Sequence, residues 1–288
     1  MFAIMGVTGQ VGGEVARTLL AGGEKVKAIV RSAEKGAAWK ERGCEIAVAS
    51  TEDSGSLRRA FEGAEGVFAM MQPIFDPTPG YPEARDAINS LYEALSAAKP
   101  GRLVFLSTIG GQVERPNLLY QLHLMEEQIG KLLTPVCFLR AGWFMENSIG
   151  DLARARDNGL ILSFLQPLNK VVPMVATADI GRTAAALLLE DWQGGRVVQL
   201  EGPTRISPND LAAAFARVLG REVRTEVVPR EGWEALFRLQ GMKNPEPRMQ
   251  MLDGFNEGWI EFEGGETASS KGVRTIDEVL QGLVDSPR

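Results

Sequence analysis

The stretch that decides the fold is FAIMGVTGQVGGEVARTLLAGGEKVKAIVR, residues 2–31. Residues 2–5 are apolar, which is typical of a short buried strand. Apolar residues then recur at helical spacing over 11–20. Gly22-Gly23 ends that helix, and the alternation over 26–30 predicts a second strand. The stretch therefore predicts a unit of strand, glycine turn, helix and strand.

The turn in this unit has the pattern Gly6-x-Thr8-Gly9-x-x-Gly12. A helix N-terminus presents unpaired N–H groups and a partial positive charge, so it binds anions. Glycine allows the backbone to approach a pyrophosphate closely, although such a turn can also be purely structural. Because this one directly follows a strand and opens a helix, it predicts dinucleotide binding. The residues expected to bind are Gly6, Thr8, Gly9, Gln10, Val11 and Gly12.

The end of the second strand indicates which dinucleotide is bound. NAD-binding units usually place an acidic residue there, which accepts the ribose 2′-hydroxyl. This chain has Arg31 instead, with Lys35 four residues later. A guanidinium can hold a 2′-phosphate bidentately, so we predict NADP(H), although both cations could simply belong to a solvated helix start. Some of Met70, Met71 and Gln72, at the end of a later strand, are expected beside the cofactor, with Met71 and Gln72 as the candidates, although methionines at such positions more often belong to the core.

Strand and helix patterns alternate along the chain to about residue 140. This alternation predicts an α/β fold with a doubly wound, mainly parallel Rossmann sheet and a smaller C-terminal α/β lobe. We assign residues 1–145 to the dinucleotide-binding core and 146–288 to the substrate-side lobe, interleaved with the core. In the second half, three helices are expected to begin at a capping residue, namely Thr177, Ser207 and Thr275.

Bulk composition excludes several classes of protein. The net charge is −6 and the pI about 5.2, without an arginine-rich run, so direct nucleic-acid binding is not expected. No apolar run approaches the length of a membrane span, and the first residues form a core strand rather than a signal peptide. Cys44 and Cys137 lie in strand-like stretches and are predicted to be buried free thiols, which indicates a cytoplasmic protein. No cysteine–histidine cluster has metal-ligand spacing, so no metal is expected.

The candidates for proton transfer are few. A tyrosine followed four residues later by lysine would be the usual relay, but none of the three tyrosines has this partner. The only histidine, His123, has Tyr120 three residues before it and Glu127 four residues after it, which places all three near one helix face. His123 could act as a general acid or be an ordinary helix residue beside a glutamate. Ser107 and Thr108, at the end of a strand, could contact substrate or cap a loop.

An aromatic pair follows the sixth predicted strand. Trp143 and Phe144 could form the floor of a pocket for a flat substrate, or they could be ordinary core residues.

Several of these stretches together resemble the NmrA-like branch of the atypical short-chain dehydrogenase/reductases. The matching stretches are GVTGQVG at 6–12, Val30-Arg31, FLS at 105–107, His123-x-x-x-Glu127, LRAGWFMEN at 139–147, Val172-Pro173, DIG at 179–181 and EGP at 201–203. The resemblance implies an NADP-binding Rossmann domain, with the glycine-turn residues and Arg31 in the cofactor-binding role. Ala49-Ser50 departs from the Gly-Asp pair of many members, which puts the adenine-side contacts in doubt.

Two functions follow from these expectations. The first is an NADP(H)-dependent reductase of quinones or similar flat electrophilic acceptors, in which Trp143 and Phe144 stack the acceptor and His123 donates a proton. The second is a non-catalytic NADP(H) redox sensor that acts through a protein partner, as some relatives do. A nucleotide-sugar epimerase is a weaker third alternative, because such enzymes normally keep the tyrosine–lysine pair. A homodimer is plausible.

Overall fold

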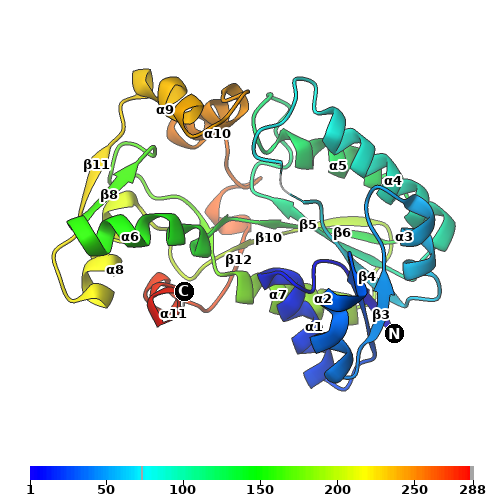
Figure 1. Ribbon diagram of the computed structural model, residues 1–288. Coiled ribbons are helices and arrows are strands. Elements are labelled where there is room, and N and C mark those ends of the chain that lie inside the picture. Colours follow the sequence, from blue (N-terminus) through cyan, green and yellow to red (C-terminus); the bar gives the residue numbers. More distant parts are fainter. Residues whose placement is uncertain (73, 286–288) are drawn as a thin grey trace.

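A computed structural model describes residues 1–72 and 74–285. In this part of the chain, eight strands form one parallel sheet in the order β12-β10-β6-β5-β4-β1-β2-β3 (Figure 1). The strands are β1 (Phe2–Ile4), β2 (Val26–Val30), β3 (Glu45–Val48), β4 (Gly66–Ala69), β5 (Leu103–Thr108), β6 (Val136–Ala141), β10 (Gly195–Glu201) and β12 (Ser270–Lys271). Strands β1 to β6 lie in the order β6-β5-β4-β1-β2-β3 of a doubly wound Rossmann sheet, which confirms the predicted fold class.

Helices cover both faces of this sheet, because successive side chains of a buried strand point to opposite faces. Ile4, Ala28 and Phe68 pack toward one face, and Ala3, Ile29 and Val67 toward the other. In Figure 1, α1 and α7 lie below the sheet, and α4 and α5 lie above it. The helices of the core are α1 (Gln10–Ala21), α2 (Ala33–Glu41), α3 (Ser54–Phe61), α4 (Pro82–Ala98), α5 (Tyr120–Ile129) and α7 (Thr177–Leu189).

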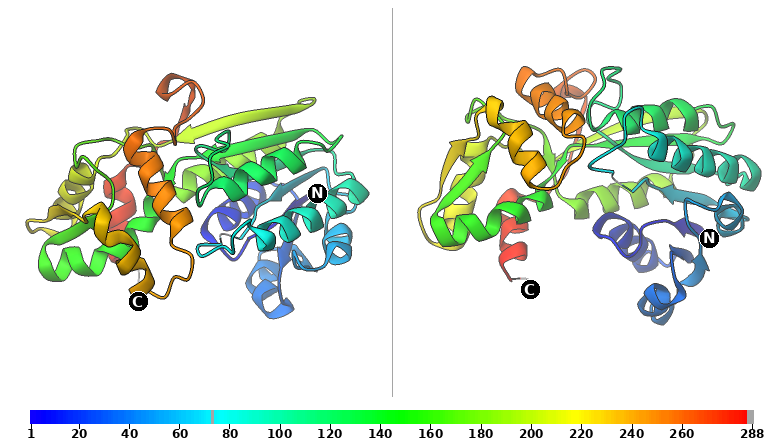
Figure 2. Two further views of the ribbon diagram at one scale, coloured as in Figure 1. Left: turned by 90° about the horizontal axis from the view of Figure 1, so that it is seen from above. Right: turned by 45° about the horizontal axis from the view of Figure 1, so that its top comes forward.

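The second half of the chain builds a lobe beside the sheet (Figure 2). Phe215, Trp233 and Phe237 lie in the apolar core of this lobe. Its elements are β7 (Trp143–Phe144), η1 (Met145–Ser148), α6 (Ile149–Asn158), β8 (Leu160–Ser163), β9 (Met174–Val175), α8 (Pro208–Leu219), β11 (Arg224–Val227), η2 (Arg230–Gly232), α9 (Trp233–Leu239), α10 (Glu246–Glu257), η3 (Glu266–Ala268) and α11 (Ile276–Asp285). Because α7 and β10 return to the sheet, residues beyond 145 contribute to both parts, and the division at that residue stays a prediction.

Two of the three predicted helix caps are confirmed. The Ser207 side chain accepts from the Asp210 N–H and the Asp210 carboxylate accepts from the Ser207 N–H, which is a capping box. Thr275 and Glu278 exchange the same two bonds at α11. The prediction for Thr177 is wrong: Ala176 is the cap residue of α7, and the Glu146 carboxylate accepts from the Thr177 N–H at 2.9 Å and from its hydroxyl.

Three further properties of the fold concern membrane spans, metal ions and cysteines. Within residues 1–72 and 74–285, none of the helices combines the length and apolar character that crossing a bilayer requires. The same ranges contain no group of three or more His, Cys, Asp or Glu side chains placed to hold a metal ion. Cys44 and Cys137 are both buried and free, as predicted, and burial raises the pKa of the Cys137 thiol to about 11.

Candidate active site

The glycine turn lies between β1 and α1, where the sheet order reverses around β1. In open α/β sheets, ligands bind beyond the carboxyl ends of the strands at this switch point. Gly6 has φ +68°, a conformation that favours glycine. A Cβ on Gly12 would lie 2.4 Å from the Met5 carbonyl oxygen and 2.5 Å from that of Gly6. The turn and α1 therefore approach so closely that position 12 admits only glycine.

The N-terminus of α1 is open to an anion. Gly9 is its cap residue, no side chain of the described residues caps it, and its first turn contains no acidic residue. Thr8, Gly9 and Gln10 are exposed, whereas the Val11 side chain is buried in the core, so Val11 can offer only its main chain. This arrangement is a backbone cradle that fits the pyrophosphate of a dinucleotide.

The structure brings Arg31 and Gln72 together beside this cradle. Arg31 follows β2 and is exposed, and its Nη1 donates to Gln72 Oε1 at 3.4 Å. Lys35 is exposed on α2, one helical turn further on. Two exposed cations at the end of β2, without the acidic residue of NAD-binding units, fit a 2′-phosphate. The residues present therefore fit NADP(H).

The two methionines that follow β4 point in different directions. The sulfur of Met70 lies 2.6 Å from where a Cβ on Gly6 would be, so Met70 contacts the glycine turn. Met71 points the other way and its side chain is buried in the core against α3 and α4. Any contact of Met71 with the cofactor would therefore be through its main chain.

Ser107 is held in a buried ionic network. Its hydroxyl donates to the Glu126 carboxylate, which also accepts two bonds from Arg140, at 2.9 and 2.6 Å. The Glu126 and Arg140 side chains are 10% and 6% exposed. Glu263 and Gln112 accept the remaining bonds of Arg140. Ser107 is therefore positioned as part of this network, whereas the half-buried Thr108 ends β5 and its carbonyl accepts from the Gly111 N–H.

Glu126 and Arg140 are not among the site residues predicted from the sequence. The signal that could have found them is Arg140 itself, a charged residue in the otherwise apolar strand VCFLR. Such a charge is buried only with a partner.

His123 lies where its helix spacing predicts, between Tyr120 and Glu127. Its ring stacks on Tyr120 at 5.1 Å between centroids, and Nε2 lies 3.8 Å from the Glu127 carboxylate. Nδ1 lies 3.0 Å from the Gly111 carbonyl oxygen, which can only accept a hydrogen bond. The proton of Nδ1 is therefore committed to Gly111, and Nε2 is the atom that can gain and lose a proton.

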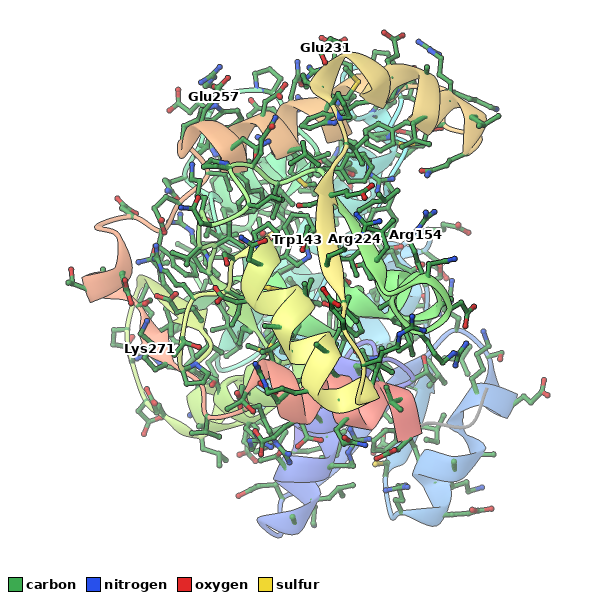
Figure 3. All side chains as sticks on the ribbon, turned by 90° about the vertical axis from the view of Figure 1, so that its left-hand side faces the viewer. Trp143, Arg154, Arg224, Glu231, Glu257 and Lys271 are labelled. Carbon is green, nitrogen blue, oxygen red and sulfur yellow. The ribbon has the colours of Figure 1, made fainter. Side chains whose placement is uncertain are left out.

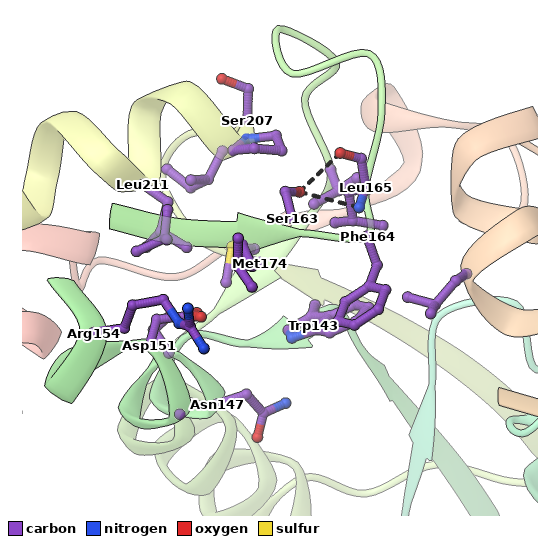
Figure 4. A pocket seen from close by; sticks show the side chains of 18 of the residues that line it. Trp143, Asn147, Asp151, Arg154, Ser163, Phe164, Leu165, Met174, Ser207 and Leu211 are labelled. Carbon is purple, nitrogen blue, oxygen red and sulfur yellow. Dashed lines mark hydrogen bonds between the residues drawn. The ribbon is translucent and has the colours of Figure 1, made fainter. Parts of the chain in front are cut away.

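Trp143 and Phe144 point in different directions because they are neighbours on β7. Phe144 packs against the sheet core, and Trp143 packs on the lobe core, 5.2 Å from Phe255 between ring centroids. Trp143 also lines a pocket of about 490 Å³ between α6, β8, α8 and α10 (Figure 4). In Figure 3, Trp143 and Arg154 lie below the helices that carry Glu231, just before α9, and Glu257, the last residue of α10. Only Trp143 of the predicted pair therefore borders the pocket.

A carboxylate in the loop before α4 links the Rossmann part to the lobe. The Asp76 carboxylate accepts from the N–H groups of Lys243 and Asn244 at 2.9 and 2.7 Å. These two bonds lower the pKa of Asp76. In the same region Gln121 donates to the Ile74 carbonyl at 3.0 Å. The proline-rich loop is thereby fastened to the segment between α9 and α10.

We expect Asp76→Ala to release this contact. Amide exchange at Lys243 and Asn244, measured as hydrogen–deuterium exchange, should become faster than in the wild type. Asp76→Asn keeps one acceptor oxygen, so its exchange rates should lie between those of the wild type and Asp76→Ala. Because the pKa of Asp76 is lowered, the contact is complete above the ordinary pKa of an aspartate and is lost as the pH falls through the lowered value. Unchanged exchange at both amides in Asp76→Ala would contradict the link.

A family model and several curated relatives match this chain. The sequence model of the NmrA-like family matches residues 1–278. The chain is 27% identical to an NAD(P)H azoreductase of Xenophilus azovorans, over 89% of this chain and 85% of that protein. It is 23% identical to quinone oxidoreductase 2 of Escherichia coli, over 100% of this chain and 94% of that protein.

Solved structures show the same fold. An NADPH-dependent quinone oxidoreductase of Escherichia coli, complexed with NADPH, matches with a TM-score of 0.82 at 21% identity, over 99% of this chain and 100% of that chain. The triphenylmethane reductase of Citrobacter sp., complexed with NADP(H), matches with a TM-score of 0.81 at 20% identity, over 98% of this chain and 99% of that chain. With the family model spanning nearly its whole length, the chain belongs to the NmrA-like family.

Proposed function

We propose that the protein is an NADPH-dependent reductase of quinones or similar flat, electrophilic acceptors. The observation that carries this proposal is the cofactor cradle, with Arg31 beside it where an acidic residue would select NAD. Relatives named azoreductase, quinone oxidoreductase and triphenylmethane reductase support it, because each of these names denotes the reduction of a flat, conjugated acceptor. Reduced nicotinamide supplies a hydride when it is bound.

Each part of the chain has a defined task in this proposal. The open N-terminus of α1 binds the pyrophosphate, and Arg31, with Lys35 close by, binds the 2′-phosphate. Trp143 borders the space for the acceptor, and His123 donates a proton from Nε2 to the reduced oxygen. Tyr81 takes no part, because its hydroxyl donates to the Asn117 carbonyl at 3.0 Å. The simplest test is whether NADPH is consumed when a quinone is added.

Arg31→Ala is expected to weaken NADPH binding by about 10- to 100-fold, because hydrogen bonds to a charged group each contribute about 1.5–3 kcal/mol. NADH lacks the 2′-phosphate, so its affinity should change little. Calorimetric titration with both cofactors measures the difference. Lys40→Ala, an exposed cation at the far end of α2, is the control and should change neither affinity. Equal weakening of both cofactors, or none, would remove the 2′-phosphate role.

His123→Ala is expected to lower kcat with menadione by about 10²-fold, the lower range for loss of a general acid. His123→Asn is the matched variant, since its amide can replace Nδ1–H as donor to Gly111 but cannot transfer a proton. Both variants should lose activity in steady-state assays. If His123→Asn keeps the wild-type kcat, the histidine serves only to position the loop.

A further inference from the structure

The pocket beside Trp143 is lined mostly by apolar side chains of the lobe. Ile161, Phe164, Met174, Leu211 and Leu252 form much of its wall. Its volume of about 490 Å³ lies within the range of sites for small organic ligands, which is about 300–1,000 Å³. An apolar wall of this kind suits a hydrophobic or conjugated ligand. The polar side chains that also line the pocket then determine which ligand is bound.

Arg248, on α10, is one of the two arginines that line this pocket. Its guanidinium stacks over the Phe237 ring at 4.4 Å, and Nη1 contacts the Met242 sulfur at 3.7 Å. Among the residues that the structure describes, no carboxylate forms an ion pair with it, whereas Arg140 and Arg205 each pair with at least two. Burial lowers the pKa of Arg248. A partly buried cation without a partner is costly, and an anionic ligand would offset that cost.

Asp151 and Arg154 face the same pocket from α6. Asn147, in the preceding η1, lines the pocket as well, and Figure 4 shows Asp151 and Arg154 beside each other. No group in residues 1–72 and 74–285 donates a hydrogen bond to the Asp151 carboxyl. Burial raises its pKa to about 6, and the charge of Arg154 opposes that rise.

The charged side chains that line the pocket favour an anionic ligand. At neutral pH two guanidinium groups, Arg154 and Arg248, face one carboxylate, Asp151, so the pocket carries one net positive charge. The chain as a whole carries a net charge of −6. A positive pocket in an acidic protein is complementary to a ligand with a single negative charge.

We propose that this pocket binds acceptors that carry one anionic group, with the conjugated body against Trp143 and the anion on Arg248. This proposal rests on the reductase function proposed above and specifies its substrate class. A carboxylate, sulfonate or phosphate would all present the required oxygen atoms to the guanidinium fork. The Asp151 carboxylate has the same charge as the bound anion, so it weakens the binding of that anion.

The first test measures binding alone. Naphthalenesulfonate, which does not accept hydride, is titrated into the protein by calorimetry in the presence of NADP. We expect Arg248→Met to weaken its binding about tenfold or more and Arg248→Lys to weaken it less. Asp151→Asn should strengthen it by removing the repelling charge. Arg238→Met, an exposed arginine on α9 that pairs with Glu234, is the control and should leave binding unchanged.

The second test measures selectivity in turnover. The ratio of kcat/KM for naphthoquinone sulfonate to that for neutral menadione should fall about tenfold in Arg248→Met and stay constant in Arg238→Met. An unchanged ratio, or equal binding of naphthalenesulfonate by wild type and both Arg248 variants, would overturn the proposal. If the wild type reduces neither quinone but binds naphthalenesulfonate through Arg248, the reductase function fails and the anion site stands.

Discussion

Gly12→Ala is expected to abolish measurable NADPH binding and to destabilise the protein. The new Cβ would lie 2.4 Å from the Met5 carbonyl oxygen and 2.5 Å from the Gly6 carbonyl oxygen, and both oxygens belong to the backbone of the turn. To relieve the overlap, α1 must move away from β1, which displaces the N–H groups that form the anion cradle. We expect a loss of affinity of at least about 100-fold, and a loss of about 1–3 kcal/mol in the free energy of unfolding.

The control for this variant lies at the other end of the same helix. Gly22 has a right-handed backbone conformation, and a Cβ there would lie 3.4 Å from the nearest atom, an ordinary contact. Gly22→Ala should therefore bind NADPH like the wild type. Calorimetry and thermal unfolding of the two variants separate a specific effect at the cradle from a general effect on α1. Wild-type affinity in Gly12→Ala would show that the turn does not hold the cofactor.

Arg140→Met is expected to cost about 3–5 kcal/mol of stability, because it leaves a buried carboxylate without its counter-ion. Glu126 is 10% exposed and receives both strong bonds of Arg140, so its charge cannot reach water easily. Glu263, the other partner, is mostly exposed and can return to water at little cost. Urea-induced unfolding measures the loss.

A double variant tests the physical cause. Glu126→Gln in the Arg140→Met background removes the stranded charge and keeps an acceptor for the Ser107 hydroxyl. The double variant should therefore be more stable than Arg140→Met alone, by at least about 1–2 kcal/mol. If the double variant is as unstable as the single one, the loss comes from packing at β6 rather than from the stranded charge.

Local signals predicted the Rossmann part and the start of two lobe helices, because the residues that define them are close in sequence. The glycine turn, the alternation of strands and helices, and the caps at Ser207 and Thr275 each depend on residues within a few positions of one another. His123 stacks on Tyr120 and lies beside Glu127 for the same reason, since helical spacing fixes those contacts.

Contacts between distant elements were beyond such signals. Thr177 has the residue type of a cap, but Glu146 from η1 satisfies the N-terminus of α7 instead. The Gly111 carbonyl that orients His123 lies outside α5, which carries His123. Glu126, on α5, pairs with Arg140 on β6. Trp143 and Phe144 are adjacent, and adjacency on a strand separates their side chains. The strand β12 has only two residues, too few for a periodic pattern.

The most direct test of the reductase function is the absorbance of NADPH over time in the presence of the protein, with and without menadione, together with a calorimetric titration of NADPH. We expect tight NADPH binding and a loss of absorbance that requires menadione and scales with protein concentration. Tight binding without any menadione-dependent loss, extended to a small panel of other quinones, would contradict a quinone reductase and favour a cofactor-binding sensor.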